Sequence, residues 1–213
     1  MNQVWWRFVR FGFRLLYNEL AFTYDLVSWI VSMGTWRCWT RAALKHLPGE
    51  SPVLELAHGT GNLQIDLHEA GYQALGYDLS PMMGRIAGGK LRRRALPDRL
   101  AQGLAQQLPF AAASLGAVVS TFPTDFIAAP ETIREVYRVL KPGGVFVIVP
   151  NALLTGSGVT EKGLEGLYRI TGQRGGSIQQ ALLDKLFAPF VVEVTEERCP
   201  RSLVTVIIAR KIE

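Results

Sequence analysis

The sequence of 213 residues predicts a doubly wound α/β fold: a mostly parallel, seven-stranded sheet with a C-terminal antiparallel hairpin and an N-terminal helical cap. From residue 52 onward, short apolar runs alternate with amphipathic stretches, which is typical of βαβ units with helices on both faces of a sheet. The last two apolar runs are joined by too few residues for a parallel crossover. The first 50 residues have helical periodicity instead.

The N-terminal 50 residues are expected to form the cap, and residues 51–213 one globular domain. In residues 3–18 the polar and basic side chains occupy a narrow arc of a helix, so most of its surface is apolar. This helix packs on protein or, as an alternative, lies on an anionic membrane surface. Two further helical patterns follow at Ala21–Ser32 and Thr35–His46, before Pro48 and Gly49 break the chain.

The domain itself alternates strands and helices. We expect strands at 51–57, 72–78, 100–103, 115–120, 145–150, 190–197 and 203–210. We expect helices at 62–70, 80–95, 130–140, 161–170 and 177–186. Ser80 is the predicted N-cap of the second helix and Pro81 its first residue.

Composition restricts the class of protein. Hydrophobic residues make up 48% and charged residues 19%, which argues against disorder. The net charge of +5 is unevenly spread, with one basic cluster in the first helix and one at Arg85–Arg94, and either cluster can face nucleic acid, an anionic membrane or water. No aromatic-interleaved RNA motif or zinc-finger spacing accompanies them, so no nucleic-acid partner is expected.

Location and metal content are also constrained. The N-terminal arginines interrupt the apolar run that a signal peptide or a spanning helix needs, which favours a cytoplasmic protein, with peripheral membrane contact through residues 3–18 as an alternative. Cys38 and Cys199 lie far apart in the sequence and are expected to be reduced thiols. The three histidines are scattered, so no metal site is expected.

The strongest chemical signal is the segment 53–62, Val-Leu-Glu-Leu-Ala-His-Gly-Thr-Gly-Asn. An apolar strand enters a turn of small residues and then a helix, which lets a ligand approach the backbone and the helix N-terminus. By itself such a turn is also compatible with a tight connection that binds nothing. Asp78 supplies the second element, because a carboxylate at the end of the second strand can accept both hydroxyls of a ribose. A solvated turn aspartate or a partner of Ser80 is the alternative for this residue.

These motifs resemble motif I and the following elements of the class I S-adenosylmethionine-dependent methyltransferases. The resemblance is to the small-molecule branch that includes ubiquinone and menaquinone biosynthesis enzymes. It extends over residues 15–150 through Tyr24-Asp25, Gln106–Phe110, Leu115–Val119 and Arg134–Gly144. It implies S-adenosylmethionine as cofactor and methyl transfer to a small, hydrophobic acceptor, quinone-like or lipid-like. Neither the acceptor nor the oligomeric state follows from the sequence.

The resemblance also implies residue roles. Glu55 orients the methionine end of the cofactor, beside the backbone of Ala57, Gly59 and Gly61. Asp78 holds the ribose, Leu79 flanks the adenine, and the backbone near Leu104 and Ala105 reads its edge. Thr121 faces the sulfonium, and Tyr24 closes over the cofactor. The catalytic candidates are Tyr24 and Asp125, and for Asp125 capping of the following helix is the favoured alternative.

Three departures from the family pattern bear on function. Ala57 stands where the family usually has glycine, which is tolerable if φ there is negative; Leu104 replaces an acidic residue, and Leu115-Gly116 replaces Phe-Asp. These changes keep a second hypothesis open, a degenerate adaptor at a membrane or protein surface without catalysis. A nicotinamide dehydrogenase is disfavoured, because Gln64 stands where its third glycine is needed.

Overall fold

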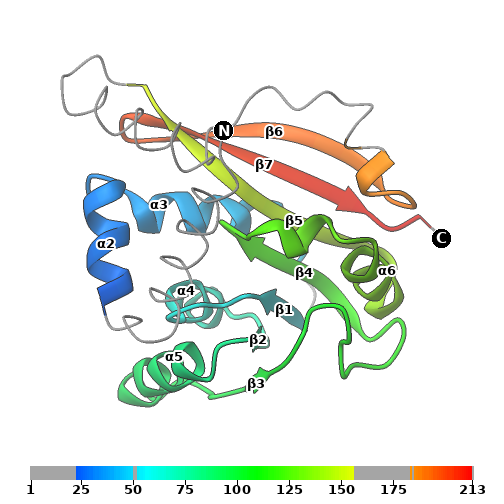
Figure 1. The fold of residues 1–213 in the computed structure, drawn as a ribbon, viewed down its shortest axis with the longest axis horizontal. Helices are drawn as coiled ribbons and strands as arrows, with labels where there is room; N and C mark the ends of the chain where they lie inside the picture. The colour runs from blue at the N-terminus through cyan, green and yellow to red at the C-terminus, as the bar shows by residue number, and fades with distance from the viewer. Residues whose placement is uncertain (1–22, 50–51, 156–182, 184, 213) are drawn as a thin grey trace, which may run out of the picture.

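The computed structural model describes residues 23–49, 52–155, 183 and 185–212. Its centre is a seven-stranded sheet in the order β3-β2-β1-β4-β5-β7-β6 (Figure 1). The strands from β1 to β5 pair in parallel, and β7 is antiparallel to both β5 and β6. The predicted fold class, with its C-terminal hairpin, is confirmed.

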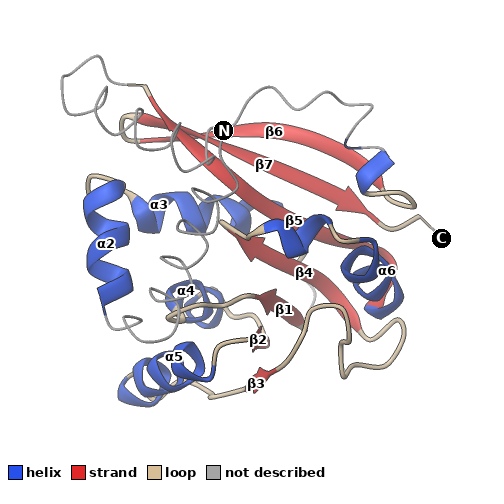
Figure 2. Ribbon diagram, viewed as in Figure 1, coloured by secondary structure: helices blue, strands red, loops and turns tan. Residues whose placement is uncertain are grey.

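Helices flank this sheet, as Figure 2 shows. The strands are β1 (Val53–Leu56), β2 (Ala74–Asp78), β3 (Leu100–Gln102), β4 (Leu115–Thr121), β5 (Leu140–Leu154), β6 (Val191–Cys199) and β7 (Ser202–Arg210). The α-helices are α2 (Tyr24–Val31), α3 (Trp36–Arg41), α4 (Asn62–Glu69), α5 (Pro81–Arg93) and α6 (Pro130–Val139). Two short 3-10 helices, η2 (Ala42–His46) and η3 (Asp125–Ala128), complete the described elements.

Alternate side chains of the central strands enter two separate apolar clusters. On one face, β1, β4, β5 and β7 pack against α3, η2 and α4, and Trp39 is the largest buried side chain there. On the other face, the same strands pack against α6 and the segment that contains Phe187 and Phe190. Burial on both faces explains why the inner strands read as continuous apolar runs. The cap helix α3 is thus part of the main core.

Some boundaries differ from the predicted ones. The predicted helix Thr35–His46 is divided into α3 and η2. The predicted strand 145–150 is the centre of a longer strand, because Leu140 already pairs with Leu115 and Leu154 still pairs with Ser202. The predicted helices at 3–18 and 161–170, and most of that at 177–186, lie outside the described residues.

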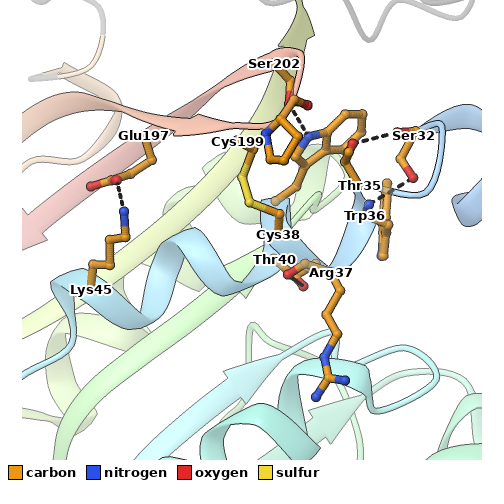
Figure 3. Close-up of a disulfide and its surroundings, with 12 residues drawn as sticks. Ser32, Thr35, Trp36, Arg37, Cys38, Thr40, Lys45, Glu197, Cys199 and Ser202 are labelled. Atoms are coloured by element: carbon orange, nitrogen blue, oxygen red, sulfur yellow. Dashed lines mark hydrogen bonds and ion pairs between the residues drawn. A yellow bond between two sulfur atoms is a disulfide. The ribbon is translucent and has the colours of Figure 1, made fainter.

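The cysteine prediction is wrong, because Cys38 and Cys199 form a disulfide with a Cα–Cα distance of 6.0 Å (Figure 3). The sequence separation of 161 residues hides this proximity. The topology creates it, since α3 covers the sheet next to the turn that joins β6 and β7. Around the bond, Trp39 Nε1 donates to Ser202 Oγ at 2.7 Å and Lys45 Nζ donates to Glu197 at 2.5 Å.

Within the ranges that the structure describes, no helix has both the length and the apolar character needed to cross a bilayer.

Candidate functional site

The glycine-containing loop between β1 and α4 is the centre of the site. Ala57, Gly59 and Gly61 all have positive φ, at 56°, 53° and 79°. The Ala57 N–H donates to Tyr77 O at 2.7 Å, which fixes the start of the loop against β2. Gly61 lies against α5, since a Cβ on it would be 2.7 Å from the Cβ of Ala87. The condition of a negative φ at Ala57 is therefore not met, and this alanine is held in a conformation that favours glycine.

Asp78 joins this loop to the end of β2. One carboxylate oxygen accepts the Gly59 N–H at 2.9 Å, and the other accepts the Ser80 N–H at 2.7 Å. Ser80 caps α5 as predicted, since its Oγ accepts the Met83 N–H, and Pro81 is the first helical residue. Asp78 is thus a partner of the Ser80 backbone, and its half-buried carboxylate retains lone pairs for further donors.

Two apolar side chains project from the ends of β2 and β3. Leu79 is 62% exposed and Leu104 is 49% exposed. Gly103 N–H donates to Asp78 O at 3.0 Å, which holds the two strand ends side by side. Ala105 lies against the apolar cluster behind them. The pair of exposed leucines offers a flat ring an apolar contact next to the Asp78 carboxylate.

Glu55 lies beneath the loop. Its side chain is buried, and Gln64 Nε2 donates to its Oε2 at 2.8 Å. Burial raises the pKa of Glu55 to about 8, with the nearby carboxylates of Asp78 and Asp66 adding to the rise. His58, also buried, contacts Gly59 O through Nδ1 at 2.9 Å, and burial lowers its pKa.

A hydrogen-bond network that the sequence reasoning missed ties the cap to the loop. The carboxylate of Asp25, in the first turn of α2, accepts from Thr60 at 2.6 Å, Asn62 at 2.9 Å and Lys90 at 2.5 Å. Lys90 also donates to the Asn62 Oδ1 at 2.8 Å. Burial opposes ionisation of Asp25, but the hydrogen bonds from Lys90 and Thr60 outweigh it and lower its pKa. Lys90, which counted as part of a surface basic cluster, is instead an internal partner of the cap.

An aromatic group covers the end of β4. Thr121 is the last residue of β4, and Phe122 follows it with φ +50°, a strained value for a bulky residue. The rings of Phe122 and Trp36 are stacked with centroids 4.3 Å apart. Tyr24 meets Trp36 edge to face at 6.3 Å. Tyr24 and Thr121 thus border one aromatic surface between the cap and the sheet.

The favoured interpretation of Asp125 as a helix cap is wrong. Asp125 lies within η3, whose N-cap position is occupied by Thr124, and α6 begins after Ala129. Neither helix has a side-chain cap hydrogen bond, and the N-cap residue of α6 is Ala129, whose methyl side chain has no acceptor. The Asp125 side chain is exposed on the loop that follows β4.

The residues brought together at the carboxyl edge of the sheet fit a ligand with a ribose and a planar base. The open space around Gly59 allows backbone approach, Asp78 supplies the carboxylate, and Leu79 with Leu104 supplies apolar contact. In the described part of the chain, no group of three or more His, Cys, Asp or Glu side chains is arranged to hold a metal ion. Fold and site together define a nucleoside-binding α/β protein.

Comparison with known proteins narrows this class. The methyltransferase domain family matches residues 54–148. A demethylmenaquinone methyltransferase of Deinococcus radiodurans is 35% identical over 139 residues, which are 63% of this chain and 58% of that protein. A ubiquinone/menaquinone biosynthesis C-methyltransferase of Syntrophotalea carbinolica is 34% identical over 161 residues, 73% of this chain and 66% of that protein. These matches confirm the resemblance to the S-adenosylmethionine-dependent methyltransferases.

Solved structures agree on the fold. A methyltransferase of Thermotoga maritima has a TM-score of 0.59 at 19% identity, covering 89% of this chain and 96% of that one. A geranyl diphosphate methyltransferase with bound S-adenosylmethionine has a TM-score of 0.62 at 13% identity, covering 83% and 85%. The chain spans 55–63% of the length of the first three curated relatives that it matches.

Proposed function

We propose that this protein transfers the methyl group of S-adenosylmethionine to a small apolar acceptor of quinone-like or lipid-like character. The observation that carries the cofactor assignment is the contact between Asp78 and Gly59, which joins the ribose-type carboxylate to the glycine loop at 2.9 Å. S-adenosylmethionine is the cofactor of the family, and it supplies a methyl group already activated by a sulfonium. The protein then needs mainly to align the acceptor and exclude water.

Each candidate residue has a place in this proposal. Asp78 accepts the ribose hydroxyls, and Leu79 and Leu104 contact the adenine while the backbone at Ala105 borders its edge. The loop from Ala57 to Gly61 lies against the methionine portion, with the buried side chain of Glu55 beneath it. Thr121 and Tyr24 border the sulfonium side.

The apolar acceptor is supported by the aromatic surface at the end of β4. Phe122 and Trp36 present stacked, half-buried rings beside Thr121. Planar apolar molecules stack favourably on such rings. The relatives named above, which methylate demethylmenaquinone or act in ubiquinone and menaquinone biosynthesis by their names, point to the same acceptor class. Membrane contact through residues 3–18 stays a prediction, because those residues lie outside the described ranges.

Calorimetric titration with S-adenosylmethionine and S-adenosylhomocysteine tests the cofactor assignment. We expect micromolar affinity in the wild type and a loss of at least about tenfold in Asp78→Ala, because charge-assisted hydrogen bonds are each worth about 1.5–3 kcal/mol. Asp125→Ala is the matched control, since it removes a carboxylate from the acceptor loop and should leave cofactor affinity unchanged. Absence of binding at millimolar ligand, in a protein shown to be folded, would overturn the enzyme proposal and favour the adaptor.

The same Asp125→Ala variant tests whether Asp125 takes part in methyl transfer. If Asp125 is the base or orienter for the acceptor, methyl transfer to a reduced naphthoquinone slows while S-adenosylhomocysteine affinity stays at the wild-type value. Unchanged turnover would remove Asp125 from the list of catalytic candidates.

A further inference from the structure

The disulfide lies in the wall of an open cavity that shares no residue with the candidate cofactor site. The cavity has a volume of about 580 Å³ and lies between α3, α4 and the turn that joins β6 to β7. Cavities of this size accept small organic molecules. Both Cys38 and Cys199 line it, and both keep part of their surface exposed. A small molecule in the cavity therefore lies against both cysteines.

The charges around the cavity favour an anion. Its cations are Arg37, Arg41, Lys45 and Arg198, and its carboxylates are Asp66, Glu69 and Glu197. Arg37 is paired with Asp66 at 2.5 Å and with Glu69 at 3.2 Å, and Lys45 is paired with Glu197 at 2.5 Å. Figure 3 shows the Lys45 pair and the Arg37 side chain beside the disulfide. With these carboxylates engaged, the cations are in excess.

Arg41 and Arg198 carry most of that excess. Arg41 is 3.8 Å from the Asp66 carboxylate, which Arg37 already occupies at shorter distance, and its side chain is 58% exposed. Arg198 is exposed and directly precedes Cys199. A cation beside a cysteine stabilises its thiolate and makes it a better leaving group in disulfide exchange.

We propose that Cys38–Cys199 is a thiol–disulfide exchange site for a small anionic thiol, and that the state of this bond sets how tightly the cap is held on the sheet. The thiolate of the reductant attacks one of the two sulfurs, a mixed disulfide forms, and the other cysteine leaves as a thiolate. A second reductant thiolate then attacks the mixed disulfide and releases the first cysteine. Two electrons pass to the protein, and the reductant leaves as its own disulfide.

After reduction, α3 and η2 still contact the rest of the protein through non-covalent interactions. The Trp39–Ser202 hydrogen bond, the Lys45–Glu197 pair and the Arg37–Asp66 pair do not depend on the disulfide. Reduction therefore removes the covalent link but leaves α3 docked by polar contacts and by Trp39 in the core. The expected consequence is more frequent local opening of α3 and η2, with the sheet intact.

Thiol counting in glutathione buffers tests the exchange site directly. The chain has only two cysteines, so alkylation followed by intact mass reports zero or two modified thiols without ambiguity. We expect the oxidised full-length protein to be reduced in its folded state by millimolar reduced glutathione, and to re-form the bond in oxidised glutathione. A bond that stays intact under native conditions but is reduced in urea would overturn the proposal, as would free thiols that do not pair in oxidised glutathione.

A second experiment tests whether the arginines around the cavity favour an anionic reductant. Arg41→Ala and Arg198→Ala should each slow reduction by glutathione, which carries carboxylates in addition to its thiolate, about two- to fivefold more than reduction by 2-mercaptoethanol, which carries only its thiolate. Arg134→Ala, an exposed position on α6, is the matched control and should change neither rate. Equal slowing with both reductants, or no slowing with glutathione, would refute recognition of an anionic thiol.

Hydrogen exchange measures the effect on the cap. In the reduced protein, and in the Cys38→Ser/Cys199→Ser double variant, amides of residues 36–46 should exchange at least about tenfold faster than in the oxidised protein, while those of α4 should not change. Unchanged exchange in 36–46 would refute the coupling. Neither this readout nor thiol counting involves S-adenosylmethionine, so their failure is distinct from a failure of the proposed methyl transfer.

Discussion

The positive φ of Ala57 can be converted into a stability measurement with an internal reference. Ala57 and Gly59 occupy the same loop with nearly equal φ, 56° and 53°, but one carries a Cβ and the other does not. The substitutions Ala57→Gly and Gly59→Ala therefore remove and add the same methyl group at nearly the same φ. A Cβ added at Gly59 would have no neighbour within 4 Å, so only the backbone term changes there.

The magnitudes follow from that geometry. An L-residue with a side chain in the left-handed region costs about 1–2 kcal/mol. Gly59→Ala should thus lower the free energy of unfolding by about 1–2 kcal/mol, reduced in part by the lower entropy of the unfolded chain. Ala57→Gly should raise it by about 0.5–1 kcal/mol, because relief of strain exceeds the entropy of about 0.4–1 kcal/mol that glycine adds to the unfolded state.

Urea unfolding of the oxidised protein measures both changes. The midpoint should move in opposite directions for the two variants with no change in slope, and Tm should shift by about 2–4 °C per kcal/mol. Gly61→Ala should lower the free energy of unfolding by more than Gly59→Ala does. Its Cβ would lie 2.7 Å from the Cβ of Ala87, and this clash adds to the backbone strain. A destabilised Ala57→Gly variant, with Gly59→Ala behaving as expected, would refute the strain assigned to Ala57.

Three further predictions concern buried polar groups. The folded-state pKa of Glu55, about 8, lies above its ordinary value of 4.5. Between these two pH values the folded protein therefore retains a proton that the unfolded chain releases. The free energy of unfolding should fall as pH rises through this range, by at most about 1.4 kcal/mol per pH unit. Denaturation of Glu55→Gln across pH 5–9 should lack this slope; an equal slope in the variant would contradict the assignment. Asp25, whose pKa is lowered, contributes stability that is present above pH 3.8 and lost as pH falls further. Asp25→Asn should therefore cost at most about 1 kcal/mol at pH 7, because the amide accepts the Lys90 hydrogen bond less strongly and solvent screens this partly exposed pair. The cost should fall to nearly nothing once Asp25 is protonated, and a pH-independent loss would point to packing instead. Trp39→Phe removes the hydrogen bond to Ser202 and should cost about 1–2 kcal/mol in urea unfolding, with Trp29→Phe on the exposed face of α2 as a near-neutral control.

The sequence predicted the architecture well because its signals are local. The apolar runs of β1 and β4, the Ser80–Pro81 helix start and the short connection before β7 each depend on a few neighbouring residues. The predicted strand 145–150 is too short, because residues 141–144 (Lys-Pro-Gly-Gly) and 150–151 (Pro-Asn) interrupt its apolar run, whereas pairing with β4 and β7 continues the strand to Leu140 and Leu154.

Long-range features of the site were beyond that kind of signal. In the sequence, Asp25 is separated by 35, 37 and 65 positions from its hydrogen-bond partners Thr60, Asn62 and Lys90. The two cysteines of the disulfide are 161 positions apart. Lys90 lies in the sequence among surface arginines, and its spacing does not distinguish it from these arginines. The sequence does not predict the sign of φ at Ala57, because a residue type alone does not reveal its backbone conformation.

The ring closed by Cys38 and Cys199 also determines how the oxidised chain carries mechanical load. The strands from β1 to β6 and the glycine loop lie inside the ring, whereas α2 and β7 lie outside it. A pulling force applied to the two ends passes through the sulfur–sulfur bond and bypasses everything within. Among the strands and helices that the structure describes, α2 and β7 are then stretched, and β7 must be separated from both β5 and β6. After reduction the same force reaches Asp78 and the loop that it holds, so a single covalent bond separates a mechanically shielded site from a loaded one.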